Sequence, residues 1–152
     1  MSDRGVFVAA FVTVVLIGGG AFAIPQFFPL ELARSLIYVA IAIMVFFGED
    51  KYSYMLGILA PAVGWIAAIV TGEFVDAFQV LFASVAMKPL AALETPLHAL
   101  ALITEALLAI LSWRAWSKEV PLPFLGKVFG ICLAIALGHA LVVFLYFVKI
   151  VH

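Results

Sequence analysis

The sequence predicts an all-α integral membrane protein: a bundle of five transmembrane helices plus one short interfacial or re-entrant helix at about residues 74–87. Two observations predict this class. Hydrophobic residues make up 67% of the 152 residues and charged residues only 11%, whereas a typical soluble domain has about 45–50% and about 25%. The charged residues also gather between long apolar segments. A soluble domain of this length has too much surface for so few polar side chains to cover.

The apolar segments set the predicted spans. A bilayer core about 30 Å thick needs about 20 apolar helical residues. The segments that meet this requirement at once are residues 5–24, 29–48, 53–71 and 124–148. A long apolar stretch remains between the third and the last of them, and Pro89 and Pro96 divide it, because proline lacks a backbone donor and disfavours helix at the residue before it.

Thr95-Pro96 is typical of a helix start, with threonine as the N-cap and proline in the first turn. We therefore expect a further span over residues 96–116. The rest of the stretch, residues 74–87, is too short to cross a bilayer comfortably. Five of its apolar residues share one helical face, which predicts an interfacial or re-entrant helix: Phe74, Phe78, Leu81, Phe82 and Val85.

The connections are short, so residues 1–152 are expected to form one transmembrane domain without a soluble domain. Five spans divide the eight Lys and Arg residues unequally. The N-terminal side carries Arg4, Lys51, Arg114, Lys118 and Lys127, and the other side carries Arg34, Lys88 and Lys149. Positive charge accumulates on the cytoplasmic side of membrane proteins, which predicts a cytoplasmic N-terminus. The absence of targeting features favours the plasma membrane as the location.

Several function classes find no support in the residues. The net charge is −1 and no basic patch exists, which argues against nucleic-acid binding. Cys132 has no cysteine partner for a disulfide or a redox motif. The sequence also lacks a nucleophile elbow, a phosphate-binding loop and a cysteine/histidine cluster. These absences favour a protein that is not an enzyme without deciding the question.

Most charged residues fall at predicted helix ends. Glu31 and Arg34 lie one turn apart near the start of a span and are interpreted as an interfacial ion pair. His98, Glu105 and His139 fall inside predicted spans instead. Ionisable groups inside a membrane are costly, so these three residues are candidates for a functional site.

The helical rise predicts how these residues meet. Glu105, counted from the start of its span, and His139, counted from the end of the next, each lie about 15 Å below the outer surface. Consecutive antiparallel helices joined by a short linker are expected to be neighbours. We therefore predict that Glu105 and His139 face each other or a shared cavity.

Two more residues extend this pair toward the outer surface. His98 lies two helical turns before Glu105 on the same face, and Glu94 lies just before the helix start. Together Glu94, His98, Glu105 and His139 predict a polar line from the outer surface to the centre of the membrane. Thr104 and Ser112 extend the line if the rotation of the helix permits.

Three interpretations of the line remain open. A hydrogen bond between a neutral Glu105 and His139 would tie two helices together, which is worth about 0.6 kcal/mol on average. Alternatively, carboxylates and imidazoles within a membrane often form proton or ion pathways. The third interpretation is a metal or haem site with His98, Glu105 and His139 as ligands. The two histidines differ in depth by about 10 Å, which disfavours a shared haem, and the sequence requires no cofactor.

Glycines at two places in the sequence are candidates for helix packing or ligand approach. Gly126-x-x-x-Gly130 is a spacing that lets helices approach closely. Gly18, Gly19 and Gly20 weaken a helix by about 1 kcal/mol each relative to alanine. They predict either close packing against a neighbouring helix or an unwound segment where a ligand can approach.

The sequence thus favours a non-enzymatic component of a membrane assembly, with a buried Glu/His site able to assist proton or ion movement. Its expected partners are the lipid bilayer and either other membrane subunits or a second copy. One alternative is a stand-alone carrier or channel for a proton-coupled solute or an ion. The other is a membrane-embedded metal or haem protein.

Overall fold

The computed structural model describes residues 2–89, 95–120 and 125–151. These residues form six α-helices and one short 3₁₀ helix: α1 (Ser2–Ala23), η1 (Pro25–Phe27), α2 (Phe28–Phe46), α3 (Asp50–Thr71), α4 (Glu73–Val85), α5 (Leu97–Glu119) and α6 (Leu125–Val151). Five of the helices are long and apolar enough to cross a membrane. The predicted all-helical class with five long apolar helices is confirmed, and it suggests a membrane protein.

The predicted helix bounds agree with the structure to within three residues. The largest differences lie at the starts of α1 and α3 and at the ends of α5 and α6, where each helix is longer than its apolar segment. At the start of α5, the hydroxyl of Thr95 accepts a hydrogen bond from the backbone N–H of Leu97 at 3.3 Å. The threonine therefore supports the helix start, but the N-cap is Pro96, one residue later than the sequence predicts.

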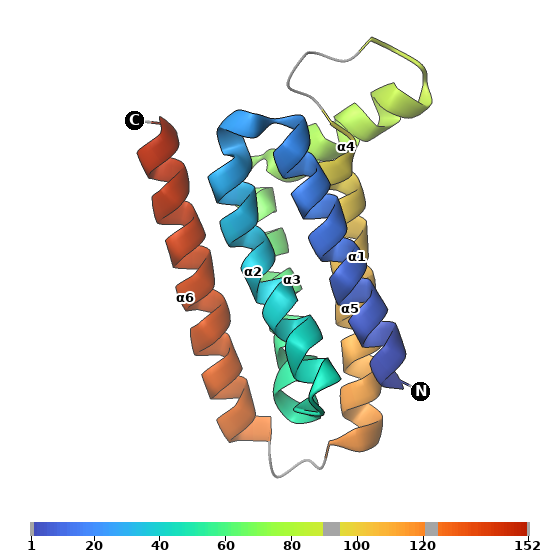
Figure 1. Ribbon diagram of the computed structural model, residues 1–152, viewed down its shortest axis with the longest axis vertical. Helices are drawn as coiled ribbons and strands as arrows, with labels where there is room; N and C mark the ends of the chain where they lie inside the picture. The colour runs from blue at the N-terminus through green and yellow to red at the C-terminus, as the bar shows by residue number, and fades with distance from the viewer. Residues whose placement is uncertain (1, 90–94, 121–124, 152) are drawn as a thin grey trace.

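The helices pack as an elongated bundle in which α1 lies against α2 and α5, and α3 lies against α5 and α6 (Figure 1). We call the end of the bundle with η1 and α4 the α4 end. The opposite end, where α1 begins and α2 turns into α3, is the N-terminal end (Figure 1). Leu108, Tyr54 and Ile41 are among the largest fully buried side chains, and they join α5, α3 and α2 in one core.

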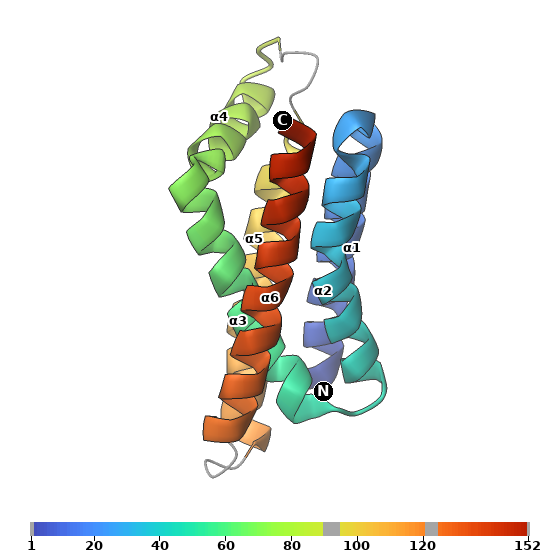
Figure 2. The same cartoon turned by 90° about the vertical axis from the view of Figure 1, so that its left-hand side faces the viewer.

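Helix α6 is the most peripheral of the long helices (Figure 2). Among the described helices it packs against α2 and α3. Its buried face consists of Val128, Cys132 and Ala136, which recur every fourth residue as one helical stripe. Most of its other large side chains are exposed, so a wide apolar face of α6 is left to the surroundings of the bundle.

Helix α4 covers the ends of α3 and α5 at the α4 end (Figure 2). Its predicted apolar face is present only in part. Phe74, Phe78 and Leu81 pack against buried residues of α3 and α5, but Phe82 and Val85 are exposed. The last turn of α4 projects beyond the bundle (Figure 1).

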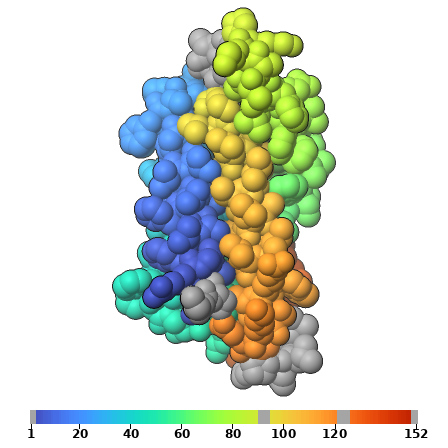
Figure 3. Space-filling model, turned by 90° about the vertical axis from the view of Figure 1, so that its right-hand side faces the viewer, coloured from blue at the N-terminus to red at the C-terminus, as the bar shows by residue number. Residues whose placement is uncertain are grey.

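Helix α1 runs beside α5 along one face of the bundle (Figure 3). The hydroxyls of Thr13 and Thr104 lie 3.0 Å apart across this contact. Helix α1 is continuous through Gly18, Gly19 and Gly20, so the alternative of an unwound segment is wrong. A Cβ atom on Gly19 would lie 3.4 Å from Leu97 and one on Gly20 would lie 3.8 Å from His98, so these two glycines face α5, whereas nothing lies within 4 Å of a Cβ on Gly18.

The closest helix contact that depends on a glycine joins α3 and α5 at Gly57. A methyl group there would clash with the hydroxyl of Ser112. We expect Gly57→Ala to lower the thermal stability of the protein in detergent, because overpacking costs about 1–3 kcal/mol. Adding Ser112→Gly should restore most of the loss. Gly126→Ala is the matched control, since nothing lies within 4 Å of a Cβ there; an equal loss in both single variants would contradict the assignment of the contact.

Candidate functional site

A group of polar side chains lies inside the bundle near the α4 end. Helices α2, α4 and α5 supply them. We call this group the polar cluster: Glu31, Arg34 and Tyr38 from α2, Glu73 from α4, and His98 and Glu105 from α5. On α2 the three residues recur at helical spacing, so one face of this otherwise apolar helix is polar and points inward.

Arg34 lies at the centre of the polar cluster. Its Nη1 is 2.8 Å from Oε1 of Glu73, which is a charge-assisted hydrogen bond. Its Nη2 is 3.7 Å from Oε1 of Glu105, a longer ion contact. The side chain of Arg34 is 16% exposed, and that of Glu73 is 42% exposed. One guanidinium thus joins a carboxylate at the surface to a carboxylate in the interior.

Glu105 is completely buried, with 0% of its side chain exposed. Neither of its carboxyl oxygens has a well-formed hydrogen bond to any described residue. Buried polar atoms are nearly always hydrogen-bonded in proteins, so two unsatisfied oxygens on one carboxyl group require an explanation. The explanation is either a function or a proton that makes the group neutral.

Gly64 of α3 makes room for this carboxyl group. A Cβ atom on Gly64 would lie 3.6 Å from Oε2 of Glu105 and 3.7 Å from the hydroxyl of Tyr38. The phenol of Tyr38 thus faces the same carboxyl group from α2 and interacts with it. The titratable and charged groups around Glu105 are therefore Arg34, Tyr38, Glu73 and Glu31.

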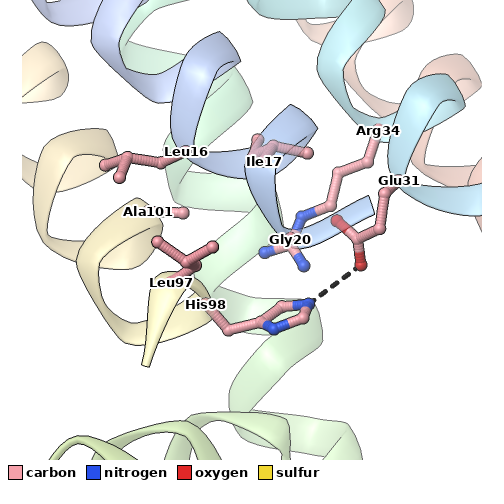
Figure 4. A pocket seen from close by; sticks show the side chains of 8 residues that line it. All are labelled: Leu16, Ile17, Gly20, Glu31, Arg34, Leu97, His98 and Ala101. Atoms are coloured by element: carbon pink, nitrogen blue, oxygen red, sulfur yellow. Dashed lines mark hydrogen bonds and ion pairs between the residues drawn. The ribbon is translucent and has the colours of Figure 1, made fainter. Parts of the chain in front are cut away.

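His98 and Glu31 form the second pair of the polar cluster. Nε2 of His98 lies 2.9 Å from Oε1 of Glu31, and Figure 4 shows this contact beside the side chain of Arg34. An ionised Glu31 can only accept, so Nε2 carries the hydrogen. The other oxygen of Glu31 is buried without a partner. Gly20 and Ala101 help to line a narrow crevice here, too tight for a water molecule.

The charges of the polar cluster do not balance when every carboxyl group is ionised. Three carboxylates, those of Glu31, Glu73 and Glu105, interact with the single guanidinium of Arg34. A protonated His98 balances one of the two excess negative charges. The remaining charge needs one more proton or a cation, and Glu105 is the most deeply buried carboxyl group of the three.

Glu73, at the surface end of the polar cluster, shows how Arg34 acts on its neighbours. Burial raises the pKa of the Glu73 carboxyl, but the charge of Arg34 and its hydrogen bond lower it by more. The pKa of Glu73 in the folded protein therefore lies below its ordinary value of 4.5. Glu73 stays ionised near neutral pH and holds α4 to Arg34.

The structure brings two of the predicted site residues to one cluster and separates the third. His98 and Glu105 both lie in the polar cluster, on the face of α5 that the spacing predicts. His139 does not. Its Nε2 donates a hydrogen bond to the backbone carbonyl of Ala33, at 2.8 Å. The predicted contact between Glu105 and His139 is therefore wrong.

The reason lies in the helix arrangement. Helix α3 packs against both α5 and α6, and the described parts of α5 and α6 make no close backbone contact with each other. Consecutive helices are usual neighbours, but here an earlier helix separates them. His139 instead holds α6 to α2 through the carbonyl of Ala33, one residue before Arg34.

Three other predicted positions have different outcomes. Glu94 lies outside the described residues. Gly126 and Gly130 are exposed on α6, with no neighbouring atom within 4 Å of a Cβ there. Their spacing therefore serves no close packing among the described residues, and contact with a partner stays a prediction.

The metal and haem interpretation loses its ligand set. His98, Glu105 and His139 have separate partners in Glu31, Arg34 and the carbonyl of Ala33. Among the residues that the structure describes, no three His, Cys, Asp or Glu side chains are arranged to hold a metal ion.

Four members of the polar cluster are absent from the site that the sequence predicts: Glu31, Arg34, Tyr38 and Glu73. The sequence predicts that Glu31 and Arg34 are partners of each other at the interface, whereas they pair with His98 and Glu73. The polar spacing of Glu31, Arg34 and Tyr38 along α2 was the available signal. No comparable signal identified Glu73, since its partner is 39 residues away in the chain.

No protein-family model, curated protein or solved structure matches this chain.

The partner of Glu105 can be tested by double-mutant cycles. We expect Arg34→Gln and Glu105→Gln to be coupled, with an interaction energy of about 0.5–3 kcal/mol in the free energy of unfolding. His139→Leu and Glu105→Gln should be additive within about 0.5 kcal/mol, because the two residues share no contact. Unfolding in mixed micelles provides the measurement. Coupling of Glu105 to His139 and not to Arg34 would contradict the structure.

The ion pair of Glu73 predicts a pH dependence of α4. The pKa of Glu73 is lower in the folded protein than its ordinary value of 4.5. The ion pair of Glu73 therefore contributes its full stabilisation above pH 4.5 and loses it as the pH falls through the pKa of the folded protein. Hydrogen–deuterium exchange of α4 amides should be slower in the wild type than in Glu73→Gln near neutral pH. This difference should vanish in acid.

Comparison at equal pH isolates Glu73, because every other ionisable side chain is the same in both proteins. A difference between wild type and variant that persists in strong acid would show that the Glu73 charge does not hold α4.

Proposed function

We propose that this chain is an integral membrane protein that binds and releases protons at Glu105 and is not an enzyme. The observation that carries the proposal is the complete burial of Glu105, whose carboxyl oxygens form no well-formed hydrogen bond with the described residues and which interacts with the Tyr38 hydroxyl and with Arg34. A carboxylate in a low-dielectric interior is strongly disfavoured unless it is fully paired. The 3.7 Å contact with Arg34 is too long to be a hydrogen bond.

The composition of the polar cluster supports a proton as the balancing charge. Three carboxyl groups share one guanidinium and one imidazole. The crevice beside Arg34 is too narrow for water, and still more so for a hydrated cation. Protons need no such space. Ionisable groups inside membrane helices commonly mark proton relays.

The depth of Glu105 supports the same proposal. Glu105 lies about 12 Å along α5 from its first residue, so it is separated from both ends of the helix. Glu73 and His98 lie nearer the α4 end and are partly exposed. They offer a route by which a proton reaches Glu105 from that side of the membrane.

We further propose that the N-terminal end faces the cytoplasm and that the protein lies in the plasma membrane. Arg34 belongs to the buried polar cluster, so it does not count as a loop charge. Five basic residues then lie at the N-terminal end, against Lys88 and Lys149 at the other. This asymmetry is the one expected for a cytoplasmic N-terminus. Protons would enter the polar cluster from the outer side.

Difference infrared spectroscopy of the protein in lipid nanodiscs tests proton binding at Glu105. We expect a carbonyl band from a protonated carboxyl group in a non-aqueous environment, and we expect it to disappear as the pH rises. Glu105→Gln should lack this band. Glu49→Gln is the matched control, because Glu49 is exposed in the turn between α2 and α3, and its band should equal that of the wild type.

Two results would overturn the proposal. One is a wild-type spectrum in which Glu105 contributes no titrating carbonyl band. The other is a band that survives unchanged in Glu105→Gln.

A further inference from the structure

The polar residues of α5 continue far beyond the polar cluster. His98, Glu105, Ser112 and Glu119 recur every seven residues from one end of the helix to the other. Seven residues are two turns, so all four lie close to one face, about 10 Å apart along the axis. The stripe begins at the α4 end and ends at the N-terminal end.

The N-terminal end of this stripe has its own group of polar partners. The hydroxyl of Tyr54, a fully buried residue of α3, lies 2.8 Å from Oε2 of Glu119 and also contacts the carboxyl group of Asp3. Glu119 itself is exposed. The phenol therefore joins the interior of the bundle to a carboxyl group at its surface.

Ser112 is the polar residue of the stripe between Glu105 and Glu119. It is fully buried, and its hydroxyl oxygen has no hydrogen-bond partner among the described residues. Gly57 of α3 leaves the space that this hydroxyl occupies. A serine hydroxyl both donates and accepts hydrogen bonds, so Ser112 is suited to pass a proton from one water molecule to the next.

An apolar side chain separates Ser112 from Glu105. Leu108 is fully buried and lies between them on the same side of α5. Its Cδ1 and the hydroxyl of Ser112 both lie against Gly57. Leu108 therefore places an apolar side chain between Glu105 and Ser112, and water must pass it for a proton to move.

We propose that this face of α5 is a transmembrane proton pathway, from the polar cluster past Leu108 and Ser112 to Tyr54 and Glu119, with Leu108 as its apolar barrier. The proposal rests on proton binding at Glu105 and extends it from binding to transfer across the membrane. It assigns Ser112 as a relay residue, and it assigns Tyr54 and Glu119 to the cytoplasmic exit.

The proton balance of the pathway is simple. The O–H bond of the Glu105 carboxyl group breaks, and its proton passes to a water molecule that has entered past Leu108. Ser112 accepts a proton from water and donates its own to the next water molecule. The carboxylate of Glu119 receives the proton and releases it to the cytoplasm. A proton from the α4 end, taken up at the partly exposed His98 and passed inward, restores the O–H bond of Glu105.

Proton flux into liposomes tests the pathway. The full-length protein is reconstituted with a trapped pH-sensitive dye, and a potassium gradient with valinomycin supplies the driving force. We expect Glu105→Gln to abolish flux above that of empty liposomes. Ser112→Ala should slow it several-fold. Leu108→Ala should speed it several-fold by admitting water, and the milder Leu108→Val should speed it less.

Two neighbouring positions serve as matched controls. Leu107→Ala changes an adjacent leucine that is 49% exposed on the outside of the bundle. Ser117→Ala changes a serine of the same helix that is exposed. Both should leave the flux unchanged. Circular dichroism and gel filtration identify any variant that has not folded, and Leu108→Val replaces Leu108→Ala if the latter fails.

The outcomes separate this pathway from proton binding itself. Two results would overturn the pathway while proton binding stands. One is a titrating infrared band of Glu105 without any proton flux through the wild-type protein. The other is a flux that is the same in the wild type, in Ser112→Ala and in both Leu108 variants. Absence of the Glu105 band would overturn both proposals.

Discussion

The need to neutralise charge inside an apolar bundle determines how three of the helices meet. Arg34 is nearly buried on α2, and a guanidinium cannot lose its charge. It therefore needs a carboxylate from another helix. Glu73 of α4 supplies it, and Glu105 of α5 lies 3.7 Å from the same guanidinium. The short helix α4 has only a small apolar contact with α3 and α5. Its ion pair with Arg34 gives its position a specificity that apolar packing alone would not provide.

The same arrangement explains which features the sequence could predict. Helix lengths follow from the apolar segments and from Thr95, Pro89 and Pro96, because these act locally, and the structure agrees with them to within three residues. The shared face of His98 and Glu105 is also local, since it depends only on the helical period. Both belong to the polar cluster.

The partners of these residues depend on which helices are neighbours, and this the sequence did not reveal. Helix α3 packs between α5 and α6, so Glu105 and His139, which lie on consecutive helices, do not meet. Arg34 and Glu73 are brought together across 39 residues of chain. The rule that consecutive elements are adjacent holds often but not always, and in a bundle of apolar helices no hydrophobic pattern distinguishes one neighbour from another.

The free energy of burying Arg34 beside Glu105 bears on why the polar cluster exists. Replacing a buried ion pair with apolar residues of similar size is often neutral or stabilising, and an apolar core at this place would hold α2 and α5 together at least as well. A purely structural cluster would be expected to satisfy its polar atoms, yet Glu105 and Glu31 leave three carboxyl oxygens without a well-formed hydrogen bond to the described residues. Structural polar networks are stabilising only when their members are paired. This arrangement fits the proposal that Glu105 binds and releases a proton.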